Sequence, residues 1–294
     1  MNHFVRHGVL GGMRITSIQR ELVREIPFLN AGRGPGGFYR DSLPVHHGFV
    51  DELPEGMSAI VATADLQGRE TFESAGGKPL RLLGEVLPTI LAHEIIPNLG
   101  LADGRIGVFL AGDFYTDPAL DKRGGSGDVT SVWNAFADEF DCIVGVAGNH
   151  DLFGDAATRP RFTGPVHFLD NDTVNIDELP IAGLSGIPGN PRRPWRRTED
   201  DFVEALEQLL CDSPAIVVMH EGPDLPELGF RGSPKIRHVL ERSESTLVVR
   251  GHAHWNQPFA ELSNGTQVLN VDARVVILTM DQSSGSLDGR IHET

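Results

Sequence analysis

The sequence predicts an α/β fold, in which strands and helices alternate along a single chain. Between residues 58 and 280, short apolar runs of strand length alternate with longer segments whose apolar residues recur at helical spacing. Several short runs end in polar clusters, and the ends of strands are where open α/β sheets bind their ligands. The chain has 294 residues and 40% hydrophobic content, enough for a sizeable core. We find no repeat and no linker between two cores, so we expect one domain.

The expected strands are short apolar runs, many of them rich in β-branched residues. They cover residues 13–18 as an edge strand, then 58–63, 106–110, 142–147, 166–169, 173–176, 181–187, 215–219, 246–249, 259–262, 267–271 and 274–280. Asn264-Gly265, between two of these runs, is a strong hairpin signal. Residues 13–57 show the least clear pattern, and we place His46 and His47 in a solvated loop.

Four segments have the apolar spacing of a helix. Residues 80–96 contain Pro88, which we expect to kink the helix or to start a second one. Asp128 is expected to open the next helix, Thr198 caps the third, and residues 235–242 form the fourth. The Gly-rich segment before Asp128 lacks the lysine and spacing of a phosphate-binding P-loop, which favours a flexible surface loop.

The two ends of the chain are expected to lie outside the domain. Residues 1–12 lack the apolar stretch and cleavage site of a signal peptide, so we expect a disordered leader there. Residues 283–294 form a polar tail, which leaves residues 13–282 as a single domain. No apolar run approaches the ~20 residues of a membrane span, and the two cysteines suggest no disulfide framework. We therefore expect a cytoplasmic protein without a membrane partner.

The chain is strongly acidic, with 25 Lys and Arg against 41 Asp and Glu and a net charge of −16. Its field would repel duplex nucleic acid, so we expect no stable binding to it, and an anionic substrate would need a local cation. The dense basic stretch Asn-Pro-Arg-Arg-Pro-Trp-Arg-Arg, at 190–197, is either a lid that binds a substrate or a solvated loop. Charge runs are usually solvated, which favours the loop.

Five polar clusters follow expected strands, and together they predict a metal centre. They are Asp65-Leu66-Gln67, Gly112-Asp113, Gly148-Asn149-His150-Asp151, His220 and Gly251-His252-Ala253-His254. The carboxyl ends of parallel strands meet at one rim, so these side chains are expected to converge. Taken singly, each Asp or Asn could serve a turn and each His could be an ordinary packed residue. If each residue had only such an ordinary role, their matching positions after strands would all be coincidences. A shared function is therefore favoured.

Two carboxylates, an amide oxygen and three imidazoles are too many ligands for one four-coordinate ion, so they suit two. Oxygen and nitrogen ligands without thiolate favour Mn²⁺, Fe or Zn²⁺. Asp113 is the natural bridge, because a carboxylate has lone pairs for both ions. Two ions ~3.5 to 4 Å apart can hold a bridging hydroxide and clamp a phosphoryl group for in-line attack. This chemistry predicts hydrolysis of phosphate esters.

The five polar clusters, in their order along the chain, resemble the motifs of the calcineurin-like metallophosphoesterase family. The resemblance covers roughly residues 58 to 280. The resemblance implies a sandwich of two packed sheets flanked by helices, with the active site at the carboxyl ends of the strands. It implies one metal site at Asp65, Asp113 and His254, and a second at Asp113, Asn149, His220 and His252. It also implies that His150 binds the phosphate and protonates the leaving oxygen, with Asp151 orienting His150.

One position departs from that family's pattern, because Gln67 stands where the family usually has a histidine. An amide oxygen is a poorer ligand than imidazole for Zn²⁺ or Fe, which favours Mn²⁺ here or a water in place of the side chain. The tyrosine-ligated purple acid phosphatases place their tyrosine at the position of Thr116, whereas Tyr115 is one residue early. We therefore do not expect that chemistry.

We expect a hydrolase that uses two divalent ions, with Mn²⁺ favoured, to cleave a phosphomonoester or phosphodiester by attack of a metal-bridging hydroxide. The substrate would be a small phosphate ester or a nucleotide. The alternative is a catalytically weak or silent phosphate-binding or interaction scaffold of the same fold. That alternative predicts missing ligands or a missing acid, yet only Gln67 departs and His150 is present.

Overall fold

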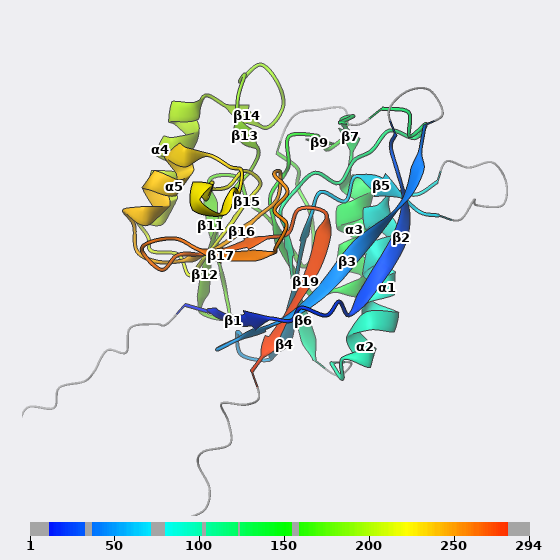
Figure 1. Ribbon diagram of the computed structural model, residues 1–294, viewed down its shortest axis with the longest axis horizontal. Coiled ribbons are helices and arrows are strands. Elements are labelled where there is room, and N and C mark those ends of the chain that lie inside the picture. The colour runs from blue at the N-terminus through cyan, green and yellow to red at the C-terminus, as the bar shows by residue number, and fades with distance from the viewer. Residues whose placement is uncertain are drawn as a thin grey trace, which may run out of the picture.

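The computed structural model describes residues 12–32, 37–71, 80–101, 104–122, 124–154 and 159–281. Two sheets pack against each other and helices cover their outer faces (Figure 1). The α/β class and the two-sheet sandwich are confirmed. The expected polar tail and all but Gly12 of the expected leader lie outside the described residues, and the domain boundaries stay a prediction. None of the helices in these ranges combines the length and apolarity that a bilayer crossing requires.

The first sheet has nine strands in the order β10-β8-β6-β4-β19-β3-β2-β5, with β1 paired to β3. Its strands are β1 (Ile15–Ile18), β2 (Arg24–Asn30), β3 (Tyr39–Val50), β4 (Met57–Ala64), β5 (Gly68–Arg69), β6 (Arg105–Leu110), β8 (Cys142–Gly145), β10 (Val166–Phe168) and β19 (Arg274–Met280). The strands β4, β6, β8 and β10 run parallel, so their carboxyl ends share one rim.

The second sheet has six strands in the order β11-β12-β15-β16-β18-β17. They are β11 (Asp172–Ile176), β12 (Leu179–Leu184), β15 (Ile216–Met219), β16 (Leu247–Arg250), β17 (Phe259–Glu261) and β18 (Gln267–Asn270). The strands β12, β15, β16 and β18 are parallel, and the expected hairpin joins β17 to β18. Two small ribbons pair β7 (Gly127–Asp128) with β9 (Asp151–Leu152), and β13 (Ile187–Pro188) with β14 (Arg196–Arg197).

The helices lie on both outer faces of the sandwich. They are α1 (Leu83–Ile90), the π-helical η1 (Leu91–Ile95), α2 (Ile96–Asn98), α3 (Thr130–Glu139), α4 (Glu199–Leu210), the 3₁₀-helical η2 (Pro226–Leu228) and α5 (Pro234–Glu241). Thr198 caps α4 as expected, since its hydroxyl accepts the Asp201 N–H at 3.2 Å. Pro88 does not end α1, and the chain changes to π-helix at Leu91.

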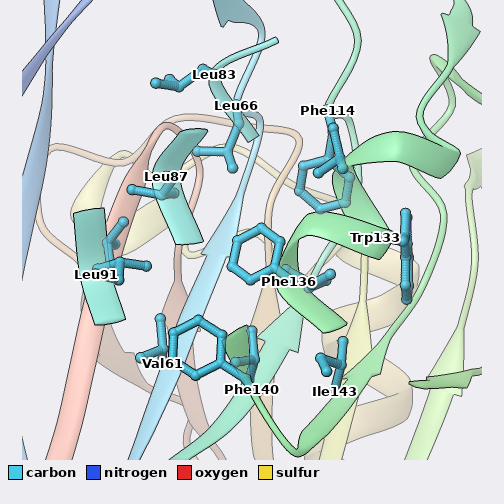
Figure 2. Close-up of a cluster of buried hydrophobic side chains, with 14 of the residues drawn as sticks. Val61, Leu66, Leu83, Leu87, Leu91, Phe114, Trp133, Phe136, Phe140 and Ile143 are labelled. Carbon is cyan, nitrogen blue, oxygen red and sulfur yellow. The ribbon is translucent and has the colours of Figure 1, made fainter. Parts of the chain in front are cut away.

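Alternation along the strands divides the core into three layers. In β6, Val108 packs under α1 and α3, whereas Phe109 points to the second sheet. In β15, Val218 faces the first sheet and Val217 packs under α4 and α5. Figure 2 shows the first of these layers, in which Leu87 of α1 and Phe136 of α3 lie in the same cluster of buried side chains. Burial on both faces of each sheet makes the sandwich a rigid support for the loops at its rim.

The expectation for the N-terminal segment was wrong, because His46 and His47 lie in strand β3 and not in a loop. The strand β3 pairs with β2 on one side and with β19 on the other. His47 Nε2 lies 2.9 Å from the hydroxyl of Thr279, a residue of β19. Many of the hydrogen bonds that hold β3 in a sheet thus come from β19, more than 200 positions away in the sequence. The local sequence pattern cannot predict them.

Candidate metal centre

The loops that carry the predicted ligands lie at one rim of the sandwich. Asp65, Asp113 and Asn149 follow β4, β6 and β8 of the first sheet, and His220 and His252 follow β15 and β16 of the second. Backbone hydrogen bonds join the rims of the two sheets, from Ala64 N to Val271 O at 3.2 Å and from Ala273 N to Ala64 O at 3.2 Å. The clusters therefore converge from both sheets, as their positions after strands predicted.

Three of the predicted ligands form a compact group. One side-chain ligand atom from each of Asp113, His220 and His252 lies within 4.8 Å of the other two. Asp113 Oδ2 is 3.3 Å from His220 Nε2, and both side chains are buried. A carboxylate and two imidazoles at this spacing fit one divalent ion.

Two buried polar atoms in these loops have no hydrogen-bond partner among the described residues. They are Nε2 of His220 and Oδ1 of Asn149. The other ring nitrogen of His220 lies 2.7 Å from Ala111 O and donates to it, so Nε2 faces Asp113 and, once it has lost its proton, offers a lone pair to a cation. A buried polar atom without a hydrogen-bond partner is costly, and a metal ion that replaces the proton on Nε2 would satisfy both atoms. The residues present therefore fit a bound cation.

The charges of the centre perturb one another strongly in the absence of a cation. Burial disfavours the charged ring of His220, yet the Asp113 carboxylate overrides it and raises the pKa of His220 to about 10. Burial, and then the neighbouring His220, lower the pKa of His252 to about 4. Burial and the Asp272 carboxylate raise the pKa of Asp65. Such opposed shifts in one cluster are typical of a functional site.

The backbone at three of the predicted ligands is in the left-handed region, with φ of 54° at Asp65, 62° at Asp113 and 67° at His252. This conformation is uncommon for residues other than glycine and concentrates at functional sites. Gly148 is required beside Asp113, because a Cβ there would lie 2.0 Å from Asp113 Oδ1. The same oxygen accepts the His150 N–H at 2.8 Å, which fixes the carboxylate.

The expected role of Asp151 needs correction, because its side chain does not hold the His150 ring. Its carboxylate accepts the backbone N–H groups of Asp113 at 2.8 Å, Phe114 at 2.8 Å and Gly148 at 2.7 Å. Burial, and then the Asp113 charge, raise the pKa of Asp151 to about 6. The left-handed turn at Asp113 turns these amides inward, and Asp151 satisfies them. Asp151 therefore ties the two ligand loops together.

The ring of His150 is half-buried at the edge of the centre. Its Nδ1 lies 3.3 Å from the hydroxyl of Ser126, in the Gly-rich segment that precedes β7. The ribbon of β7 and β9 holds that segment beside the His150 loop, with Gly127 N donating to His150 O at 3.2 Å. The ring is thus accessible to a ligand and positioned by Ser126 in place of Asp151.

The remaining predicted ligands, Asp65, Gln67 and His254, lie in a more open part of the centre. Gln67 Nε2 donates to Asp113 Oδ2 at 3.2 Å, and Asp65 Oδ2 accepts the His252 N–H at 2.8 Å. The side chain of His254 is 59% exposed. Asp65, Gln67 and His254 thus border the compact group without joining it, and their role as ligands stays a prediction.

Two carboxylates lie beside the predicted ligands: Asp272 was missed, whereas Glu221, directly after His220, could from the sequence either support the ligands or face solvent. Asp272 Oδ2 lies 3.5 Å from Nδ1 of His254, and Glu221 Oε2 lies 3.5 Å from Nε2 of His252. Asp272 directly follows the apolar run 267–271, which is the same signal that identified Asp65. Such carboxylates orient ligating imidazoles and raise their basicity.

No curated protein matches the chain. The structure of TT1561 of Thermus thermophilus is similar at a TM-score of 0.48 and 15% identity, over 74% of this chain and 90% of that one. The sulfate thiohydrolase SoxB of Thermus thermophilus, in complex with glycerol, gives a TM-score of 0.41 and 16% identity, over 78% of this chain and 58% of that one.

The family comparison covers the part of the chain that carries the site. The calcineurin-like phosphoesterase model matches residues 59–256, which is more than half of the chain and includes every predicted ligand from Asp65 to His254. The chain therefore belongs to the calcineurin-like phosphoesterase family.

Proposed function

We propose that this chain is a metal-dependent phosphoesterase that hydrolyses phosphomonoesters or phosphodiesters. Its family typically binds two metal ions and hydrolyses phosphoesters. The observation that carries the proposal is the buried Nε2 of His220, which has no hydrogen-bond partner among the described residues and lies 3.3 Å from Asp113. A cation between these groups would satisfy both, and the unpartnered Oδ1 of Asn149 supports the same inference.

The proposed ligand sets share Asp113, whose two oxygens face different neighbours. One set is Asp65, Gln67, Asp113 and His254, and the other is Asp113, Asn149, His220 and His252. Bound ions would supply positive charge for the phosphoryl oxygens and would acidify the attacking water. We favour Mn²⁺ because Gln67 offers an amide in place of an imidazole.

His150 would supply the proton for the leaving oxygen. Its ring is half-buried at the edge of the centre, and its backbone N–H is fixed on Asp113 Oδ1. A positioned acid of this kind contributes ~10² to 10⁴ in rate. Ser126, 3.3 Å from Nδ1, would steady the ring so that Nε2 faces the substrate.

A panel assay tests the proposal. Para-nitrophenyl phosphate, its bis ester, cyclic nucleotides and phosphopeptides are offered to the metal-free chain with Mn²⁺, Mg²⁺ or Zn²⁺ added separately. We expect hydrolysis of at least one ester, fastest with Mn²⁺, and its loss in the Asp113→Asn variant. A chain that binds the ions but turns over no ester would instead be the silent scaffold of the same fold.

A further inference from the structure

The Arg-rich segment at 190–197 is built into the rim of the metal centre. Gly186 N donates to Ala147 O at 2.8 Å, one residue before Gly148, and Gly186 O accepts the Glu221 N–H at 3.4 Å. Gly186 therefore lies between the loops that carry Asn149 and His220. Figure 1 shows β13 and β14 along the same edge of the molecule as β9, which begins directly after His150.

Strand pairing carries Arg196 to the same place. In the ribbon of β13 and β14, Ile187 pairs with Arg196, and Ile187 N donates to Trp195 O at 3.0 Å. Gly186 has φ of 77°, and a Cβ there would lie 1.9 Å from Trp195 O, so only glycine permits this approach. Trp195 packs on Phe153 and Phe168 with centroids 5.9 and 5.6 Å apart. The segment is thus fixed, and the expectation of a solvated loop was wrong for its second half.

The two arginines of β14 serve different purposes. Arg197 donates to Asp170 Oδ1 at 2.6 Å and to Ser185 O at 2.9 Å, which anchors the ribbon. Successive side chains of a strand point to opposite sides, so Arg196 points away from that anchor. Its stem lies against Gly189, where a Cβ would lie 3.1 Å from Arg196 Cδ.

Arg196 has no ion pair with any described residue, although the protein is acidic and the side chain is half-buried. Burial and the adjacent Arg193 lower the pKa of Arg196, while the Asp113 carboxylate raises it. Asp113 is the central residue of the metal group, and its charge acts on Arg196, in line with the placement that the strand pairing gives. Neither Arg193 nor Arg196 has a carboxylate partner among the described residues, and unpaired guanidinium groups suit an anion.

We propose that Arg196 is a substrate-binding residue, which donates to a nonbridging phosphate oxygen of the ester at the metal centre. The inference rests on the proposed function. It also answers the electrostatic problem of this chain, because a net charge of −16 repels an anionic substrate unless a local cation receives it. The planar fork of arginine suits two phosphate oxygens.

Inorganic phosphate is the probe that tests the proposal. Its binding to the Mn²⁺-loaded chain is measured by calorimetry for the wild type, Arg196→Gln and Arg196→Lys, with bound metal and melting temperature as controls for folding. Arg20→Gln is the matched control, because Arg20 is exposed in the turn between β1 and β2 and loses the same charge. We expect Arg196→Gln to weaken phosphate binding ~10- to 100-fold and to raise KM for para-nitrophenyl phosphate similarly. Arg196→Lys should recover part of the loss, and Arg20→Gln should match the wild type.

The outcomes separate this inference from the proposed function. Phosphate binding by Arg196→Gln within twofold of the wild type would overturn the inference, even if the wild type hydrolyses esters. Loss of metal together with phosphate in Arg196→Gln would overturn it too, because Arg196 would then be structural. A wild type that turns over no ester, but binds phosphate in an Arg196-dependent way, would reject the proposed function and support Arg196 as the anion site.

Discussion

The protonation of His220 gives a sharp prediction about the metal-free centre. With a pKa of about 10, the His220 ring is protonated on both nitrogens, and so positively charged, at pH 7.5 in all but roughly one molecule in 300. A metal ion needs the lone pair of Nε2, so binding must displace that proton. The displacement costs roughly 3 kcal/mol at pH 7.5, and metal affinity should rise ~10-fold per pH unit until the pH approaches 10. His252, with its pKa lowered to about 4, is already neutral and should release none.

Nitrogen NMR of ¹⁵N-histidine-labelled chain measures this directly. We expect the His220 resonances of the metal-free chain at pH 7.5 to show both ring nitrogens protonated, and Nε2 to lose its proton when a diamagnetic ion, Zn²⁺ or Mg²⁺, is added in excess. The His220→Asn variant assigns the signals among the 12 histidines. A neutral His220 ring in the metal-free chain at pH 7.5 would refute the reasoning, since Asp113 would then not govern this ring.

Three further substitutions separate the roles of neighbouring residues. Asp151→Ala leaves three buried backbone N–H groups without an acceptor, so urea unfolding should show a loss of ~3 kcal/mol or more, and a loss below ~1 kcal/mol would contradict the contacts described. His150→Ala should retain both ions by metal analysis while losing ~10² to 10⁴ in rate on esters with poor leaving groups; equal loss of metal and rate would make His150 a ligand. Gln67→His should tighten Zn²⁺ binding and move the preferred metal from Mn²⁺ toward Zn²⁺ in rate assays, whereas an unchanged preference would place residue 67 outside the ligand set.

The sequence was informative where a strand delivers a polar residue to the rim. Asp113 and His220 each follow a buried run, and parallel pairing within each sheet brings such ends together wherever they lie in the chain. Asp272 obeys the same rule and was missed only because it matched no expected motif. The rule therefore extends further than the motifs that first suggested it.

Contacts set by long-range pairing were not predictable. Asp151 satisfies backbone amides that face inward only because Asp113 is left-handed, and no local pattern gives that conformation. The pairing of Arg196 with Ile187, which brings it to this rim, is not visible in the local sequence, so its charge run looked like a solvated loop. The strand β3 pairs with β19, which lies more than 200 positions later in the chain, so the local sequence around His46 and His47 did not show a strand.

The proposed phosphoesterase activity requires a pair of cations at this rim. The most direct test titrates the metal-free chain with Mn²⁺ and records the rate of ester hydrolysis against the number of ions bound per chain. We expect no hydrolysis without metal, a maximal rate at two ions per chain, and no such rise in Asp113→Asn. Full occupancy without hydrolysis of any ester, or undiminished hydrolysis after the metal is removed, would contradict the account.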